Sequence, residues 1–464
     1  MVIGVLASAG IMVSLTQTMM VPLIPELPRL LDSSASDASW AITATLLAAA
    51  VATPVVGRLG DMYGKKRFLV YCAILLTAGS LICALTSSLI PIVAGRALQG
   101  FGIPVIPLGI SVMRDVLPRH RLGPAMALMS SSLGVGGALG LPVAALIAQH
   151  ADWHTLFWVS AGAGAVLAVL IATLVPRAPA RAGGRFDVLG AIGLATGLVA
   201  VLLPISKGSE WGWTSVPTLS LFAAGLVVLP VWGLWELRTR APLVDLRTTA
   251  RRQVLTTNLA SVVTGFGMFA MSLILPQLLQ LPPATGYGLG QSMVEAGLWM
   301  APGGLAMMAT SPVAARLSAA YGPKAALLAG TLVMAGGYGL GPLLMGTVWG
   351  VLAFSLVITV GIGFAYAAMP ALIMGAVPLS ETAAANGLNA LARSLGTSIS
   401  SAVLGAVLAA MTTTVGSMTV PSEAGLRTGL LIGAAASLVA AAVTLGVPRQ
   451  PAAVVPEPAA APAR

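Results

Sequence analysis

Long apolar runs separated by short polar segments make up most of this chain. Most runs are close to the ~20 residues that a helix needs to cross the hydrocarbon core of a bilayer. In the first part of the chain the pattern predicts six membrane helices, near residues 2–25, 40–56, 68–86, 89–112, 124–148 and 157–175. The first run has no basic start and no convincing cleavage site, so it reads as a helix and not as a signal peptide.

The pattern continues after a linker with proline and arginine at residues 176–185. Two further spans are predicted near residues 188–205 and 216–234, followed by a basic segment at 238–252 that we expect to lie along the cytoplasmic surface. Six more spans are predicted near residues 254–280, 290–314, 325–345, 348–377, 383–411 and 428–447.

We therefore predict an all-α integral membrane protein with fourteen spans. Residues 1–175 form an N-terminal six-helix bundle, and residues 176–253 hold the linker and two inserted spans. Residues 254–447 form a C-terminal six-helix bundle, and the Pro/Ala-rich tail at 448–464 is predicted to be disordered.

Composition excludes an ordinary soluble protein. Hydrophobic residues make up 57% of the 464 residues, and the mean hydropathy is +0.94. The formal net charge of +10 could suggest nucleic-acid binding, but the cations occupy short loops between apolar runs and not one face of a domain. No nucleic-acid partner is expected.

The distribution of cations predicts the orientation. With both termini in the cytoplasm, cytoplasmic segments hold 19 of the 24 Lys and Arg residues. The outer loops would hold only Arg29, Lys207 and Arg427, and Arg96 and Arg393 would lie in spans. This asymmetry follows the positive-inside rule and predicts a multi-pass protein of the cell membrane.

Cysteine and histidine do not indicate a cofactor site. Cys72 and Cys83 fall within one apolar run, where they read as small buried residues. His150 and His154 are four residues apart, a spacing that zinc could use, but no third ligand accompanies them. We expect no metal and no cofactor.

The densest cluster of charge is the loop at residues 57–67, between the second and third predicted spans. Gly57, Gly60 and Gly64 allow backbones to approach closely, and Asp61 lies among four cations. The simplest alternative is a basic loop that only anchors two helices at the membrane surface.

A second copy of this loop argues against that alternative. Residues 58–66 read RLGDMYGKK and residues 316–324 read RLSAAYGPK, with five of nine positions identical at an offset of 258 residues. Ala319 replaces Asp61, so the second copy keeps the turn and loses the acid. Two related halves with one charged loop and one degenerate copy are typical of a transporter.

The first loop resembles the signature loop of the major facilitator superfamily. That resemblance implies that Gly57, Asp61, Gly64, Lys65 and Lys66 form a cytoplasmic gating motif. It also implies two contacts in the outward-open state. Asp61 would meet the start of the thirteenth span near residues 382–383, and Lys65 would pair with Asp115 at the end of the fourth span.

A narrower resemblance, to the fourteen-span drug:proton antiporters, rests on residues 186–190, 211–213, 241–247, 276–280 and 296–304. Two departures from that family stand out. The first span lacks the usual acid, and Gln17 is its strongest polar group. The fifth-span export motif, usually G-P-x-x-G-G, reads Gly140-Leu-Pro142-Val-Ala-Ala.

The fifth predicted span is rich in small residues, among them Gly136 and Gly140. Their spacing suits close packing of helices, and Pro142 allows the helix to bend. We therefore expect these three residues to serve packing and conformational change.

Two arginines lie within predicted spans. A charge at the centre of a span costs at least about 2.5–3.5 kcal/mol, so Arg96 should face the protein interior with partners. Its setting with Gln99 resembles a fourth-span motif linked to proton coupling, while the alternative is an arginine that only ties helices together. For Arg393, structural and functional roles are both open.

Candidates for the proton site are few because the first span has no acid. Glu295 is the only acid that we place inside an apolar span, and burial there would favour its protonated form. The alternative for Glu295 is a carboxylate at the outer interface that reaches water. We predict that Glu295 is shared by proton and cargo, with Glu26 as its nearest competitor.

These observations predict a secondary active transporter that exports amphipathic small molecules in exchange for protons, as a monomer in the lipid bilayer. The proton gradient would supply the energy. The alternative within the same fold carries a lipid or specific metabolite, or imports its cargo. A membrane enzyme or an ATP-driven pump is disfavoured, because no nucleophile–base pair and no nucleotide-binding motif occurs.

Overall fold

The computed structural model describes residues 1–20, 23, 27–177, 183–415 and 418–448. Within these residues the chain is almost entirely helical. Glu26 and the tail beyond residue 448 lie outside the described residues.

The first bundle contains the six predicted spans, together with the short helices α2 and α3, which were not predicted. Its helices are α1 (Val2–Thr18), α2 (Leu27–Leu30), α3 (Ala35–Ala38), α4 (Trp40–Tyr63), α5 (Lys65–Ala84), α6 (Leu89–Gly100), α7 (Val105–Val116), α8 (Arg119–His150) and α9 (His154–Leu174).

The inserted pair and the second bundle follow. The inserted part comprises α10 (Val188–Trp211), α11 (Val216–Arg238) and α12 (Leu246–Thr249). The second bundle comprises α13 (Arg252–Gln280), η2 (Pro283–Thr285), α14 (Met293–Tyr321), α15 (Pro323–Leu344), α16 (Val348–Ala376), η3 (Leu379–Glu381), α17 (Thr382–Ala410), β1 (Thr412–Val415), β2 (Met418–Pro421) and α18 (Glu423–Leu445).

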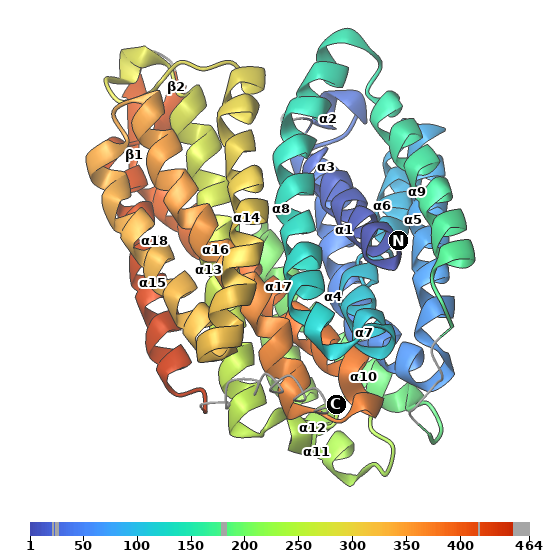
Figure 1. Ribbon diagram of the computed structural model, residues 1–464. Coiled ribbons are helices and arrows are strands. Elements are labelled where there is room, and N and C mark those ends of the chain that lie inside the picture. Colours follow the sequence, from blue (N-terminus) through green and yellow to red (C-terminus); the bar gives the residue numbers. More distant parts are fainter. Residues whose placement is uncertain (21–22, 24–26, 178–182, 416–417, 449–464) are drawn as a thin grey trace.

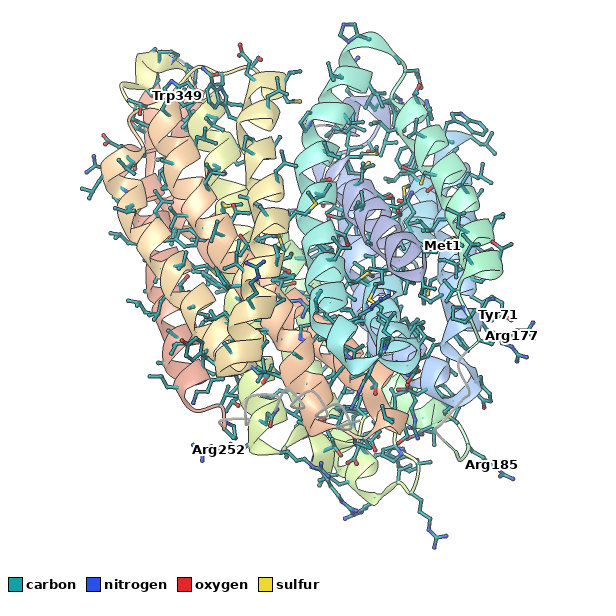
Figure 2. All side chains as sticks on the ribbon, viewed as in Figure 1. Met1, Tyr71, Arg177, Arg185, Arg252 and Trp349 are labelled. Carbon is teal, nitrogen blue, oxygen red and sulfur yellow. The ribbon has the colours of Figure 1, made fainter. Side chains whose placement is uncertain are left out.

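The two bundles stand side by side, with α8 and α14 adjacent where they meet (Figure 1). Arg177, Arg185 and Arg252 lie toward one end of the molecule, and Trp349 lies at the other (Figure 2). We call the first of these ends the basic end. It carries the turns after α4, α7 and α14 and the segments on both sides of the inserted pair.

Both copies of the repeated loop form the same turn. Gly64 separates α4 from α5 with φ at 106°, and Gly322 separates α14 from α15 with φ at 83°. Only glycine adopts such angles without strain, so each helix ends at the glycine and a new helix begins directly after it. The structure thus explains why both copies keep this glycine.

The predicted fourth span is present as one apolar stretch, Leu89–Val116, made of two helices. Turns at residues 101–104 interrupt the regular α-helix between α6 and α7. Pro104 lacks an N–H group for the helical ladder, and Gly102 approaches Leu76, whose Cβ would lie 2.9 Å from a Cβ added there.

A small hairpin between α17 and α18 was not predicted. β1 and β2 are antiparallel, with Thr412 opposite Pro421 and Val415 opposite Met418. Threonine and valine favour extended backbone because of their branched Cβ atoms. The hydroxyl of Tyr287 donates to the carbonyl oxygen of Pro421, which ties the hairpin to the loop before α14.

The inserted helix α10 touches both bundles. Leu194 and Leu198 of α10 share one hydrophobic cluster with Ala50 of α4 and Leu391 of α17. The helix is also longer than predicted and includes Lys207, which we had placed in an outer loop. That placement is wrong, because Lys207 is fully buried, bonded to the Ser39 hydroxyl and 3.0 Å from Glu210.

The segment after α11 lies at the basic end and packs on the protein. Leu243 and Val244 are 1% and 5% exposed and belong to the α10 cluster described above. That this segment follows the cytoplasmic surface stays a prediction. Only α12, one helical turn capped by Asp245, is helical in this segment.

Eleven helical segments of the described residues are long and apolar enough to cross a membrane. Helices α1, α8 and α14 do not meet that criterion over the residues described. The predicted all-helical membrane architecture is confirmed, whereas the number of fourteen spans stays a prediction.

Close packing of α8 on α1 depends on the predicted small residues. A Cβ added at Gly136 would touch the carbonyl oxygen of Ile11 and lie 2.7 Å from the Cβ of Ser14. Gly140 faces Thr18 in the same way. Pro142 lies against Gly297 of α14, whose added Cβ would lie 3.2 Å from the Pro142 nitrogen.

We expect Gly136→Ala to lower the free energy of unfolding by about 1–3 kcal/mol, because the new methyl group has to displace backbone. Thermal unfolding of the purified protein in detergent measures the change. Gly123→Ala on the same helix is the control, since nothing lies within 4 Å of its added Cβ. Equal unfolding temperatures for the two variants would contradict close packing of α8 on α1.

Candidate functional site

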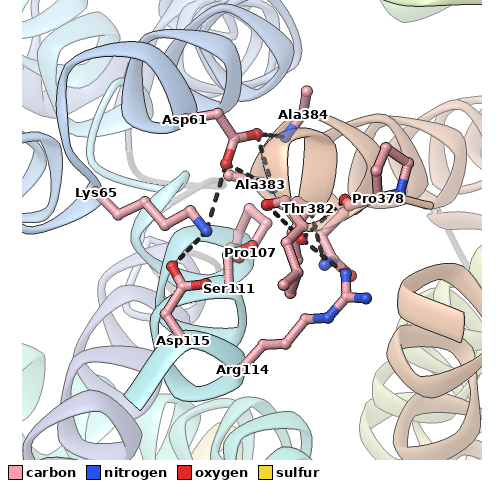
Figure 3. Close-up of polar contacts among 12 residues, drawn as sticks. Asp61, Lys65, Pro107, Ser111, Arg114, Asp115, Pro378, Thr382, Ala383 and Ala384 are labelled. Atoms are coloured by element: carbon pink, nitrogen blue, oxygen red, sulfur yellow. Dashed lines mark hydrogen bonds and ion pairs between the residues drawn. The ribbon is translucent and has the colours of Figure 1, made fainter. Parts of the chain in front are cut away.

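The candidate site lies at the basic end, where α4 of the first bundle meets α17 of the second. Asp61 in the last turn of α4 is 1% exposed and reaches the first turn of α17. Its Oδ2 accepts hydrogen bonds from the N–H groups of Ala383 and Ala384, each at 3.0 Å, as Figure 3 shows. The contact that the loop motif implied is therefore present.

This contact satisfies groups that a helix leaves open. The first N–H groups of a helix have no partner within it, and the helix dipole places partial positive charge there. A carboxylate provides both acceptor atoms and negative charge. Asp61 thus stabilises the start of α17 only while the two bundles are in contact.

Lys65 at the start of α5 lies between this acid and a second one. Its Nζ lies 2.6 Å from Oδ2 of Asp115 and 3.4 Å from Oδ1 of Asp61, and the residue is 4% exposed. The predicted pairing with Asp115 at the end of α7 is therefore present. A lysine between two carboxylates offsets part of the cost of burying their negative charge in a place that excludes water.

Arg114 makes a second polar connection between the bundles, and the sequence analysis did not select it. Its Nη1 donates to the hydroxyl of Thr382 at 2.7 Å, and its Nη2 donates to the carbonyl oxygen of Val377 at 3.3 Å (Figure 3). The only sequence signal was its position next to Asp115. We call Asp61, Lys65, Arg114 and Asp115, with residues 382–384, the interbundle lock.

Glycines bring the backbones of α4 and α17 together beside the lock. A Cβ added at Gly57 would lie 2.8 Å from the carbonyl oxygen of Ala383, and one added at Gly387 would lie 2.8 Å from that of Thr53. Lys66 is partly exposed and forms no ion pair with any described residue. Of the charged residues predicted to form the gate, Lys66 alone stays outside the lock.

The second copy of the loop makes different contacts. Lys324, which matches Lys66, donates to the carbonyl oxygens of Leu445 and Val447 at 2.7 and 2.5 Å. These oxygens belong to the end of α18, where a helix has unpaired carbonyl groups. The degenerate copy therefore acts within the second bundle and not between the bundles.

Arg96 lies in the interior of the first bundle, as predicted, and is 3% exposed. Its Nε donates to the carbonyl oxygen of Ala41 on α4, and its Nη1 donates to Oε1 of Gln99 at 2.6 Å. Gln99 in turn donates to the Ser80 hydroxyl of α5 at 2.8 Å. No ion pair to Arg96 occurs among the described residues, so its partners are neutral.

Arg393 forms a comparable network in the second bundle. Its Nη1 donates to Oδ1 of Asn389 at 2.5 Å, and its guanidinium lies 5.0 Å from the ring centre of Tyr366. The Asn389 amide donates to Asn258 at 2.9 Å and to Ser261 at 2.7 Å. Each bundle therefore contains one arginine held by amide and hydroxyl groups.

The predicted burial of Glu295 is wrong. Glu295 is exposed in the first turn of α14, where it forms a capping box with Ser292. Its carboxylate accepts from the Ser292 N–H at 2.8 Å, and its own N–H donates to the Ser292 hydroxyl. The apolar run begins later than predicted, so the desolvation on which its proposed coupling role depended is absent.

Gln17 does not join a polar network in the described residues. It lies on the exposed face of α1, while the hydroxyls on that helix bond to α8 or to its own backbone. Of the predicted polar candidates that the structure describes, Arg96, Gln99 and Arg393 lie in connected interior networks, whereas Gln17 and Glu295 do not.

Comparisons with known proteins agree with this architecture. The family model of the Major Facilitator Superfamily matches residues 6–401 and, in a second match, residues 259–463. A probable actinorhodin transporter of Streptomyces coelicolor is 30% identical over 420 residues, 87% of this chain and 71% of that protein. A tetracenomycin C resistance and export protein of Streptomyces glaucescens is 28% identical over 86% of this chain and 74% of that protein.

A solved structure has the same fold. The proton:xylose symporter XylE superimposes with a TM-score of 0.67 at 15% identity, over 97% of this chain and 95% of that structure. The chain is thus a transporter of the cell membrane and not an enzyme. It belongs to the major facilitator superfamily, among relatives that resemble drug:proton antiporters.

Proposed function

We propose that the protein exports amphipathic small molecules in exchange for protons, by alternating access of a site between its two bundles. The interbundle lock is the observation that carries this proposal. It joins the bundles at one end through hydrogen bonds from Ala383 and Ala384 to Asp61 and from Arg114 to Thr382, all of which would break together when the bundles part. Rocking of one bundle against the other would then open and close the basic end.

The strength of the lock suits a reversible contact. A carboxylate at a helix N-terminus contributes about 0.3–2 kcal/mol. A hydrogen bond to a charged group contributes about 1.5–3 kcal/mol. Opening moves these groups into water, which replaces part of what is lost. The resulting difference is small enough for the binding of cargo or a proton to shift the balance.

We further propose fourteen spans with both termini in the cytoplasm. The cation count supports this orientation, because the basic end carries the turns and linkers in which most Lys and Arg residues occur. Helices α1, α8 and α14 would then cross the membrane together with the eleven longer apolar segments.

The cargo is proposed to be amphipathic because polar groups and thioethers adjoin in the second bundle. Ser261 donates to Sδ of Met369 and Tyr366 donates to Sδ of Met268, each at 3.1 Å. Methionine adapts to ligands of different shape. Relatives named for actinorhodin transport and tetracenomycin C export support the same cargo class.

The second candidate is a transporter of a lipid or specific metabolite, or an importer. A proton:xylose symporter has the same fold, and the fold alone does not set the direction of transport. This second candidate is therefore retained. Efflux of several unrelated amphipathic dyes from loaded vesicles would favour the first candidate. Uptake of a single compound would favour the second.

The orientation predicts how single cysteines react. After replacement of Cys72 and Cys83, Gly183→Cys should react with a membrane-impermeant maleimide only in permeabilised cells. Residue 183 lies at the basic end, which is proposed to face the cytoplasm. Trp349→Cys, 72% exposed at the opposite end, should react in intact cells. The reverse pattern would contradict the proposed orientation.

The lock predicts a change of conformation in Asp61→Asn. Loss of the charge should shift the balance toward an open basic end and reduce export by about tenfold or more, since ~1.4 kcal/mol changes an equilibrium tenfold. Spin labels at the exposed Tyr63 and Leu379 measure the distance across the lock. Lys66→Gln, in the same loop but outside the lock, is the control. An unchanged distance distribution together with unchanged export would exclude the lock.

A coupling role for Arg96 predicts different effects on two kinds of transport. Arg96→Lys keeps the charge but cannot contact Ala41 and Gln99 in the same geometry. We expect proton-driven uphill transport to be lost while downhill exchange of cargo continues, both measured in proteoliposomes. An equal decrease of both would indicate that Arg96 only holds helices together.

A further inference from the structure

The inserted helix α11 contains a buried acid that has no part in the interbundle lock. Most of α11 is exposed, and its described buried residues are Thr218, Gly225 and Glu236. Glu236 is 2% exposed although it lies in the last turn of the helix. The sequence analysis ended this span at residue 234 and therefore missed Glu236, although a glutamate directly after an apolar run was a visible signal.

The carboxylate of Glu236 is only half satisfied. Its Oε2 accepts from the N–H group of Val244 at 3.4 Å, in the segment after α11. Its Oε1 is buried and has no hydrogen-bond partner among the described residues. An ionised carboxylate in such a place loses hydration that the protein does not replace.

A second carboxylate lies beside the unpartnered oxygen. Asp187 caps the start of α10, where Oδ1 accepts from the Gly190 N–H at 2.8 Å and Oδ2 accepts from Nε1 of Trp235 at 3.0 Å. A Cβ added at Gly190 would touch both Oδ2 of Asp187 and Oε1 of Glu236, the latter at 2.6 Å. The two oxygens therefore lie within about 5 Å, where like charges disfavour each other.

Cations on the surrounding elements do not compensate the pair. Arg247 of α12 directs its Nη2 to the carbonyl oxygen of Leu237 at 3.1 Å. None of the charged groups on neighbouring elements forms an ion pair with Glu236 or Asp187 among the described residues. These groups are Arg185 before α10, Arg238 at the end of α11, Arg240, Asp245 and Arg247 after it, Arg58 on α4 and Glu381 before α17.

One bound proton removes both the charge repulsion between the two acids and the lack of a hydrogen-bond partner at Glu236. A neutral carboxyl group removes the repulsion and supplies a donor for the pair, because a protonated acid carries one O–H. The proton comes from solvent at the basic end and returns there when the pair ionises. The arrangement is that of two acids that share one site and cannot both be charged without cost.

The pair lies beneath the segment that contacts both bundles. Val244, which donates to Glu236, is buried with Leu243 against α10, in the cluster that also includes Ala50 of α4 and Leu391 of α17. Residues of this segment and of the start of α17 together line a cavity of about 190 Å³. Any movement of residues 241–249 therefore changes the packing where the bundles meet.

We propose that Asp187 and Glu236 form a proton-binding site in the inserted helix pair, and that the bound proton holds residues 241–249 against the joint between the bundles. The site itself does not depend on the proposed function. Only its influence on transport rests on that function, since it would act by favouring the closed basic end.

Infrared spectroscopy of the purified protein, without cargo, tests the site directly. A protonated buried carboxyl group has a C=O stretch distinct from that of carboxylate, and we expect this band at neutral pH and its loss at alkaline pH. The band should be absent in Glu236→Gln and retained in Glu295→Gln, whose glutamate is exposed. A neutral-pH spectrum that Glu236→Gln leaves unchanged would overturn the proposal.

Asp187→Asn is a second variant that is expected to fold, because asparagine caps a helix nearly as well as aspartate. The band at neutral pH should weaken in this variant, since Glu236 no longer faces a second negative charge. A band of unchanged intensity in a folded Asp187→Asn protein would exclude a shared proton.

Hydrogen exchange tests the second half of the proposal. After correction for the intrinsic effect of pH, backbone exchange in residues 241–249 should increase at least several-fold when the pair ionises. Glu236→Gln should remove this increase. Exchange that rises equally in both proteins would show that the proton does not hold the segment, whatever the direction of transport.

Discussion

The contact of the Asp61 carboxylate with the open N–H groups of α17 is the interaction on which the arrangement of the bundles depends. A helix end buried between two bundles has no water to satisfy its first N–H groups, so another element has to provide an acceptor. The acceptor comes from the other bundle. The same contact therefore completes a helix and joins two domains, and it exists only in the conformations where the basic end is closed.

The neighbouring residues make this contact tolerable. An acid at 1% exposure would be costly alone, and Lys65 offsets its charge while it also holds Asp115 on α7. Gly57 removes the side chain that would keep the two backbones apart. Residues of one loop thus balance the buried charge, let the two backbones approach and cap α17. These three requirements explain why so many charged residues and glycines occur in so short a segment.

The inserted helix pair adds a second connection at the same joint. Helix α10 contacts α4 and α17, the two helices that the lock connects, and the segment after α11 covers the cluster that they form. If the bundles rock as proposed, the inserted pair has to move with one of them or yield, because α10 packs against both. The buried acids at its basic end lie where a change of charge would reach this covering segment.

The amino-acid sequence alone determined what periodicity, charge and local repetition encode. It predicted the helices, the two related halves and the loop that forms the lock. The partners of Asp61 and Lys65 followed only from the resemblance of that loop to the signature loop of the superfamily, because these contacts join residues far apart in the chain. It also predicted that Arg96 lies inside the protein, since a charge in an apolar run has few other places.

Only the tertiary structure decided which acids are buried. Glu295 and Glu236 both adjoin apolar runs. Glu295 caps α14 and is exposed, whereas Glu236 is buried between α10, α11 and the following segment. The sequence cannot distinguish them, because burial depends on which side of a helix meets another helix. That choice, like the meeting of Arg114 with Thr382, is made by packing between residues far apart in the chain.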